Sequence, residues 1–230
     1  LSLSIDRPGL LQEFFGGADL LNLGMPVPSH GALLPPEEVR TALRYDPDKA
    51  RGLLEAALLP GQVLRLELMV GDYGEMPVAV GERIAQGLRE VGVEVEIQVV
   101  QAPRYTASVL SAPGIFQAAF GPSRTYFEAD QWLTSRFHSG GAANGSGVDD
   151  AELDTIIGSQ KGEMDQARRT EALRQAQRRI LEEYYALPTY LDGEWVARWD
   201  WVKGWSSFPD YPYGRYLREI RVEGRTEGEP

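Results

Sequence analysis

The stretch FGPSRTYFEAD, Phe120–Asp130, holds side-chain types that recognise polar ligands. It follows the apolar run IFQAAF and contains an arginine, a threonine, aromatic rings and carboxylates. The guanidinium of Arg124 is a planar fork of N–H donors, which suits a carboxylate, a phosphate or the oxygens of a sugar. The alternative is a surface ion pair of Arg124 with Glu128 or Asp130, which contributes about 0 to 1 kcal/mol. The residues of this stretch alone do not decide between a ligand contact and a surface ion pair.

The segments before this stretch predict a parallel β-sheet. Alternating apolar residues predict strands over Val63–Val70 and Val93–Val100, and apolar residues at helical spacing predict a helix over Pro77–Val91 between them. A strand, a crossover helix and a second strand form a unit whose strands are parallel and whose crossover is right-handed. The run Ile115–Phe120 is a third, short strand. We therefore expect an α/β fold with a mixed, largely parallel sheet flanked by helices.

The sheet determines where a ligand would bind. Open α/β sheets bind ligands beyond the carboxyl ends of their strands. Gly71, Asp72 and Tyr73 follow the first predicted strand, and the stretch Phe120–Asp130 follows the third. Both segments are therefore predicted to line the same cleft.

Capping residues and turn residues outline the rest of the chain. Asp46, Asp149 and Asp165 are the predicted helix caps, and Asp149 with Glu152 resembles a capping box. The expected helices cover residues 1–15, 47–59, 105–110, 151–160 and 165–185. The expected segments without helix are a loop rich in proline and glycine over 24–36 and a late strand region over 186–199.

The composition excludes several kinds of partner. The 230 residues carry a formal net charge of −11, so no basic stripe neutralises the phosphates of a nucleic acid or binds an anionic membrane. The chain has no cysteine, which excludes disulfides, zinc–thiolate sites and thiol catalysis. No apolar run reaches the ~18 to 20 residues of a membrane span.

Catalytic and metal-binding patterns are equally missing from the sequence. It holds no G-x-S-x-G elbow, no P-loop and no dinucleotide fingerprint. His30 and His138 are isolated and form no ligand spacing for a metal. The carboxylates over 149–154 lack the spacing of a calcium loop and are better explained by helix capping. We expect a binding protein that is not an enzyme and uses no cofactor.

The tryptophans near the end of the chain have two interpretations. Trp195, Trp199 and Trp201 share the spacing of one strand face, which favours packing in a core or between lobes over stacking on a ligand. For Trp205, a hinge or a place in the cleft is expected.

Longer motifs resemble one protein family. LSLSIDRPGLLQEFFGGA resembles a helix in which its members carry AIDR, and YDPDKARGLLEAA resembles their YDPEKAKxLLxEAG. IAQGLREVGVEVEIQVV, NGSGVDDAELDTII and ALPTYLDGEWVARWDWVKGW resemble later motifs of the same members, in the same order. The family is the extracellular solute-binding proteins of family 5, the peptide/nickel class.

The resemblance implies a domain arrangement and partners. Residues 1–204 would form the second lobe of a two-lobe protein, and residues 205–230 a tail that crosses back to a first lobe outside this chain. Such proteins close on a peptide or another small solute and dock on an ABC permease. We expect an extracytoplasmic location, with a lipid anchor on the full-length protein. The chain is expected to be a fragment, and a homodimer through the surface left by the missing lobe is a further expectation.

The resemblance also assigns ligand-binding residues. Family members carry a ligand loop reading roughly FDxAxxGWxADYPDP, which FQAAFGPSRTYFEAD matches at Phe116, Gly121 and Tyr126, with Glu128 at an acidic position. Thr125 stands where peptide binders have an aspartate that pairs with the amino terminus of the peptide. A lone buried ammonium would be costly there. The predicted solute is therefore anionic or hydroxylated rather than a plain peptide amine.

The predicted ligand-binding residues are Arg124, Thr125, Tyr126, Glu128, Gly71, Asp72, Tyr73 and Trp205. Two other functions stay open. Lobes of this family also serve as ligand-sensing modules of transcription regulators, which would carry a helix-turn-helix upstream. A lobe kept for protein contacts only would expose an apolar patch and have no cleft of solute size.

Overall fold

The computed structural model describes residues 1–17, 25, 32–111, 114–123, 126, 128–190, 199–204 and 220–224. The chain divides into two compact units, Leu1–Leu191 and Asp192–Pro230. The first unit contains a parallel sheet and a group of helices, and the described part of the second contains a small antiparallel pair of strands.

The sheet of the first unit has three strands in the order β2-β1-β3. They are β1 (Arg65–Asp72), β2 (Glu94–Gln101) and β3 (Ala118–Phe120). β1 pairs in parallel with both neighbours, which confirms the predicted α/β fold and the parallel unit. β1 was predicted two residues too early, because the ladder with β2 continues to the pair Asp72 and Gln101. Gly71 and Asp72 therefore belong to the end of β1 and do not follow it.

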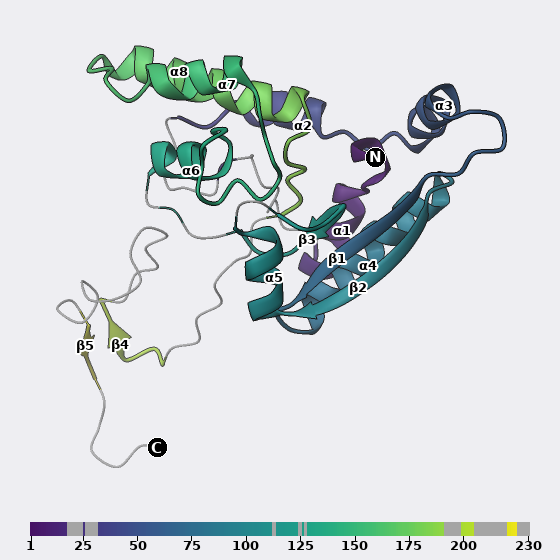
Figure 1. Ribbon diagram of the computed structural model, residues 1–230. Helices are drawn as coiled ribbons and strands as arrows, with labels where there is room; N and C mark the ends of the chain where they lie inside the picture. The colour runs from purple at the N-terminus through teal and green to yellow at the C-terminus, as the bar shows by residue number, and fades with distance from the viewer. Residues whose placement is uncertain are drawn as a thin grey trace. The chain divides into compact units, whose positions relative to one another are not determined.

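One face of the sheet is covered by α4, Glu75–Glu90 (Figure 1). Val80 and Ile84 of this helix are buried against the sheet, as the helical spacing predicts. The helix approaches β1 closely, because a Cβ added to Gly81 would lie 2.8 Å from Cγ2 of Val70. This face carries the main apolar core of the sheet.

The other face is covered at its carboxyl end by α5, Ala102–Val109 (Figure 1). Tyr105 and Val109 of this helix pack on Met69 and Val100 of the sheet. The predicted helix began at Tyr105, three residues too late, because Pro103 occupies the first turn. The helix therefore starts directly at the end of β2.

A second group of helices packs together. It consists of α2 (Pro36–Ala42), α6 (Ala129–Arg136), α7 (Ala151–Ser159) and α8 (Gln166–Glu182). α6, α7 and α8 share one core, and α2 packs on α8 through a separate small cluster that contains Val39 and Leu181. In Figure 1, α2, α7 and α8 lie together at the top and α6 lies below them. Trp132, Leu133, Leu153, Ile157 and Ile180 are among its buried residues. The sequence analysis missed α2, although Pro36 in the first turn and the acidic residues after it are helix-start signals.

The N-terminal segment is not one continuous helix, contrary to the prediction for residues 1–15. It forms a 3₁₀ helix, η1 (Ser2–Ser4), and then α1 (Arg7–Phe15). The break occurs because the Asp6 carboxylate accepts a hydrogen bond of 2.9 Å from the Gly9 amide and caps α1. α3 (Pro47–Ala57) begins after the cap Asp46, as predicted.

Three further predictions need correction or cannot be compared. Asp150, not Asp149, caps α7, because its carboxylate accepts from the amides of Glu152 and Leu153. α8 ends at Glu182, and Tyr184 lies outside it with φ 58°, so Tyr184 does not continue the buried helical face. Most of the loop over 24–36 and of the late strand region over 186–199 lies outside the described residues.

The described part of the second unit is a short antiparallel pair, β4 (Val202–Lys203) and β5 (Arg221–Val222). The rings of Trp199 and Trp201 stack with centroids 4.8 Å apart and an interplanar angle of 5°. Trp199 is 63% exposed, which does not fit the expected core packing. Trp195 lies outside the described residues, and packing against another lobe stays a prediction.

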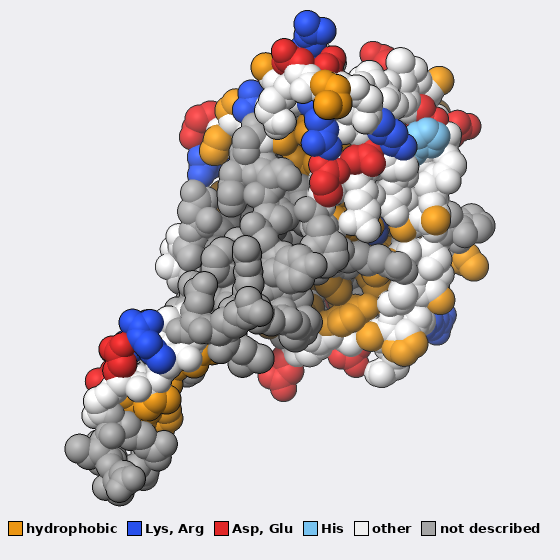
Figure 2. Space-filling view, turned by 90° about the vertical axis from the view of Figure 1, so that its left-hand side faces the viewer, with side chains coloured by type: hydrophobic (Ala, Val, Ile, Leu, Met, Phe, Trp, Pro, Cys, Tyr) orange, Lys and Arg blue, Asp and Glu red, His pale blue; other side chains and the backbone are white. Residues whose placement is uncertain are grey.

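Acidic and basic side chains lie intermixed on the face of the molecule shown in Figure 2. Ion pairs between described residues include Arg178 with Glu38 at 2.6 Å, between α8 and α2. Such half-exposed pairs contribute about 0 to 1 kcal/mol each. None of the described helices is both long and apolar enough to cross a membrane.

Candidate ligand-binding site

The carboxyl ends of β1 and β3 meet at the ring of Tyr105. Gly71 lies near the end of β1, and a Cβ added to it would be 3.0 Å from Cδ2 of Tyr105. Gly121 follows β3 directly, and a Cβ added to it would be 2.6 Å from Cζ of the same ring. The Tyr105 ring is 3% exposed and cannot move aside easily. Both positions therefore need glycine, and the structure brings these two predicted segments together.

The ring of Tyr73 lies beside that of Tyr105, and these two rings are called the aromatic wall below. The Tyr73 ring meets that of Tyr105 edge-on, with centroids 5.8 Å apart and an interplanar angle of 90°. Its hydroxyl lies 3.5 Å from the carbonyl oxygen of Ala102 and 3.5 Å from Oγ1 of Thr106. Burial raises the pKa of Tyr105, and the charge of Arg136 acts against that rise. Tyr105 is therefore a neutral hydroxyl at pH 7.

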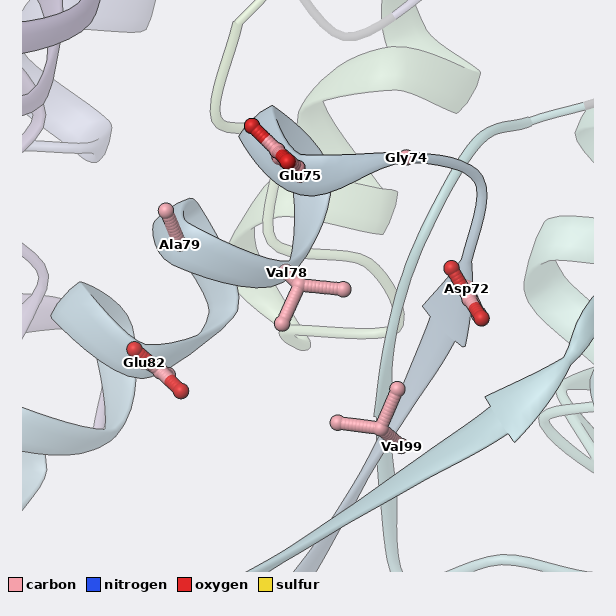
Figure 3. Close-up of a pocket in the computed structure, with 7 residues that line it drawn as sticks. All are labelled: Asp72, Gly74, Glu75, Val78, Ala79, Glu82 and Val99. Atoms are coloured by element: carbon pink, nitrogen blue, oxygen red, sulfur yellow. The ribbon is translucent and has the colours of Figure 1, made fainter.

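Asp72 points to the opposite face of the sheet and lines a shallow pocket of about 450 Å³. The pocket is lined by Asp72, Gly74, Glu75, Val78, Ala79, Glu82 and Val99. Figure 3 shows Val78 of α4 and Val99 of β2 pointing toward each other, with Asp72 at the end of β1. The Asp72 carboxylate accepts a hydrogen bond of 3.0 Å from Nε2 of Gln101. Asp72 and Tyr73 thus lie on two sides of the same sheet edge.

The carboxylates of the stretch Phe120–Asp130 are occupied by contacts within the helical group. Glu128 caps α6: one oxygen accepts from the Asp130 amide at 2.7 Å, and the other accepts from the Arg169 guanidinium. The Asp130 carboxylate accepts from Thr134 at 3.0 Å and also from the Gln160 amide. Glu128 therefore anchors the start of α6 to α8. A role of Glu128 in ligand binding stays a prediction.

Tyr126 is also directed into the helical core. It is 4% exposed, packs among the residues of that core, and its buried hydroxyl has no hydrogen-bond partner. Arg124, Thr125 and Trp205 lie outside the described residues, so their predicted roles are not compared with the structure.

Sequence reasoning missed two residues of this region, Tyr105 and Arg136. Tyr105 was taken only as the start of a short helix. Arg136 had a detectable signal, because it falls at helical spacing from Trp132 and Leu133, on the face of α6 that is otherwise apolar.

Two kinds of side-chain grouping were predicted to be missing, and the described residues can be compared with both. No cluster of three or more metal-ligating side chains occurs among them. Ser139, His138 and Asp154 do lie together, with Nδ1 of His138 3.7 Å from Asp154. Ser139 donates directly to Asp154 at 2.5 Å, and the Gly140 amide donates to Nδ1 of His138 at 3.1 Å. The histidine is therefore not placed to activate the serine. The arrangement at the sheet edge can bind a solute through aromatic faces and polar groups.

Comparison with known protein families decides the class. Residues 1–144 match the family model of bacterial extracellular solute-binding proteins, family 5, middle part. The chain belongs to this family. The match includes the whole three-stranded sheet and its carboxyl edge, and it confirms the resemblance seen in the sequence motifs. Family 5 members are binding proteins of ABC transporters rather than enzymes.

Solved structures of solute-binding proteins share the fold. The oligopeptide-binding protein AppA from Bacillus subtilis, in complex with a nonapeptide, is 16% identical with a TM-score of 0.71, over 97% of this chain and 46% of that chain. DppA from Helicobacter pylori, in complex with the peptide STSA, is 18% identical with a TM-score of 0.71, over 97% of this chain and 43% of that chain.

A third structure binds a different compound. AgaA from A. tumefaciens R10, in complex with agropinic acid, is 15% identical with a TM-score of 0.70, over 99% of this chain and 47% of that chain. This chain thus spans about half the length of these three binding proteins. No curated protein matches the sequence.

Proposed function

We propose that the protein to which this chain belongs captures a small solute between two lobes and delivers it to an ABC importer. The observation that carries the proposal is the family match over residues 1–144, which contains the sheet edge around Tyr105. Closure of two lobes would exclude water from the solute, as in hinge-bending binding proteins.

In this proposal, residues 1–204 supply the second lobe and residues 205–230 cross back toward the first. The protein works outside the cytoplasm, in keeping with a family of bacterial extracellular proteins. A lipid anchor on the full-length protein and an ABC permease as its partner complete the proposal.

The proposed wall of the site combines described and undescribed residues. Gly71, Asp72 and Tyr73 contribute the edge at β1, and Arg124 and Thr125 contribute the loop after β3. Support comes from the shared position of Gly71 and Gly121 against Tyr105. Tyr126 and Glu128 hold the end of the loop against the helical group, and Trp205 would face the cleft from the tail.

The solute is proposed to be anionic or hydroxylated. Thr125 replaces an aspartate that would pair with a peptide amine, and Arg124 adds a cation. Of the similar structures, AppA and DppA hold peptides and AgaA holds agropinic acid. A peptide is therefore the alternative solute.

The test is to purify the intact protein without unfolding it and to identify by mass spectrometry the compound released on denaturation. A small solute that rebinds in calorimetry supports the proposal. A peptide with a free amino terminus would support solute capture but contradict the assigned solute class. A helix-turn-helix in the upstream coding sequence would contradict the importer and indicate a ligand-sensing regulator.

A further inference from the structure

Arg136 is a cation on the inner face of a helix. α6 buries Ala129, Trp132 and Leu133, and Arg136 follows the last two at helical spacing. Phe137, the next residue, is 3% exposed and packs edge-on against Trp132 with centroids 4.8 Å apart. The backbone at Arg136 thus directs its side chain toward the interior.

The guanidinium of Arg136 has no acceptor in the described structure. Its Nη1 atom is buried without any hydrogen-bond partner, and no carboxylate of the described residues forms an ion pair with it. A guanidinium carries a positive charge and offers only N–H donors. Arg136 as a whole is half-buried, and a buried donor atom such as its Nη1 is unfavourable when no acceptor meets it. An acceptor is therefore missing from the described residues.

Other arginines of the same unit show what a satisfied guanidinium looks like here. Arg7 is 2% exposed and donates to the carbonyl oxygens of Pro188, Ser2 and Leu43 at 2.7 to 3.1 Å. Arg179 pairs with Asp150 at 2.6 Å. Arg136 differs from both.

Backbone contacts bring the segment after Arg136 to α5, the helix that carries Tyr105. The charge of Arg136 also acts on Tyr105, whose ring lies against Gly121. The loop that follows α6 joins the two helices: Ala143 donates to the carbonyl oxygen of Ser135 at 2.9 Å, and Gly145 packs directly on the carbonyl of Val109 at the end of α5.

Two hydroxyl groups of this region also have no partner among the described residues. Tyr105 is 3% exposed, and no hydrogen bond of its hydroxyl joins it to another described residue. The Tyr126 hydroxyl, in the core of the helical group, is buried and unpaired. Both hydroxyls can donate a hydrogen bond to an anion. Buried polar atoms are normally satisfied, so the unpaired Nη1 of Arg136 and hydroxyl of Tyr126 indicate a missing acceptor group.

We propose that Arg136, with the hydroxyl of Tyr105, binds an anionic group of the solute, such as a carboxylate, at the carboxyl edge of the sheet. This inference rests on the proposed solute-binding function and specifies the charge that its site selects. It assigns the anion contact to described residues, independently of Arg124. A guanidinium forms charge-assisted hydrogen bonds with an anion. These bonds are stronger than those that a neutral hydroxyl forms.

The test compares three forms of the intact protein: wild type, Arg136→Met and Arg104→Met. Methionine keeps the apolar volume and removes the charge, and Arg104 is an exposed arginine on α5 that serves as a matched control. Each form is purified without unfolding, and the solute released on denaturation is quantified by mass spectrometry. We expect wild type and Arg104→Met to release the same anionic solute, and Arg136→Met to release at least about tenfold less.

The outcomes separate this inference from the proposed function. A released solute without any anionic group, or equal amounts from Arg136→Met and wild type, would overturn the anion site and leave solute capture intact. No solute from any form, with no binding of small solutes in calorimetry, would overturn the proposed function and the anion site with it.

A second measurement examines the solute-free proteins. Because Arg136→Met removes a guanidinium whose Nη1 atom is buried and unpaired, its melting temperature should equal or exceed that of wild type. A clearly lower melting temperature would show that the rest of the protein, such as a carboxylate of the other lobe, already pairs with Arg136, and would contradict the inference.

Discussion

At the scale of single residues, the sheet edge depends on two glycines that leave room for aromatic rings. An added Cβ would lie 2.6 Å from the Tyr73 ring at Gly71, near the end of β1, and 2.6 Å from the Tyr105 ring at Gly121, directly after β3. The Tyr105 ring in turn packs with Met69 and Val100 and is 3% exposed. The geometry of the wall is therefore sensitive to the smallest possible substitution.

Gly121→Ala is expected to lower the free energy of unfolding by about 1–3 kcal/mol, because the added Cβ overpacks the contact with Tyr105. Urea unfolding followed by circular dichroism measures the change. Gly52→Ala is the matched control: Gly52 lies inside α3 with nothing within 4 Å of an added Cβ. The control should gain about 0.5–1 kcal/mol, and an equal loss in both variants would contradict the packing argument.

At the scale of elements, single polar side chains join segments that are far apart in the sequence. Arg7 connects the N-terminal segment to the residue after α2 and to the chain near Pro188. Asp150 caps α7 and also accepts hydrogen bonds of 2.6 Å from Arg179 and 3.0 Å from Tyr185. Arg7 and Asp150 therefore each join segments that are distant in the sequence.

Arg7→Met should lower the free energy of unfolding by about 3 kcal/mol, because buried carbonyl oxygens lose their donors. Denaturant titration at neutral pH measures this loss. Arg51→Met is the comparison, since the contacts of Arg51, an ion pair with Asp48 and a long hydrogen bond of 3.5 Å to the carbonyl oxygen of Glu90, are exposed. That variant is expected to stay within about 0.5 kcal/mol of wild type.

The stability of the first unit depends on pH through the carboxylate of Asp150. The hydrogen bond from Arg179 is the main cause that lowers the pKa of Asp150 from 3.8 to about 2. A carboxylate whose pKa falls on folding stabilises the protein above its unfolded pKa, and this contribution is lost as the pH falls from about 4 through 2. The contribution is about 2 kcal/mol at neutral pH.

Asp150→Asn should therefore remove about 2 kcal/mol at pH 7 and much less near pH 2. Urea unfolding of wild type and variant at several pH values between these limits measures the difference. Asp149→Asn is the neighbouring control, because Asp149 is exposed and does not cap α7. An equal pH profile for Asp150→Asn and wild type would contradict the role of the Arg179 pair.

At the scale of the whole molecule, this chain covers less than half of the length of similar binding proteins such as AppA. If the solute site lies between two lobes, one lobe supplies only part of the contacts and none of the closure. The chain expressed alone should then bind the solute of the intact protein at least about 100-fold more weakly. Calorimetry on both forms, with circular dichroism to establish that the chain is folded, measures the ratio, and equal affinities would contradict the two-lobe site.

Some properties follow from the sequence alone, because they depend on neighbouring residues along the chain. Alternation and helical spacing identified β1, α4 and β2 and their parallel order, and Asp46 and Asp165 marked helix starts correctly. Motifs in a fixed order identified the family. Such signals are local, so they place elements well and their ends less well, as the late end of β1 shows.

Only the tertiary structure decides which distant side chains meet. Glu128 is predicted from its own stretch to contact a ligand, and only the structure shows that its carboxylate also binds Arg169 and the start of α6. Tyr105 becomes a wall of the sheet edge only because two strands bring Gly71 and Gly121 to it. Arg136 is an ordinary surface residue by its type, and only the packing of α6 buries its Nη1 atom without a partner. The sequence by itself determined the elements and the family, whereas burial and pairing, which set the chemistry of the site, arise from contacts between segments that local patterns do not encode.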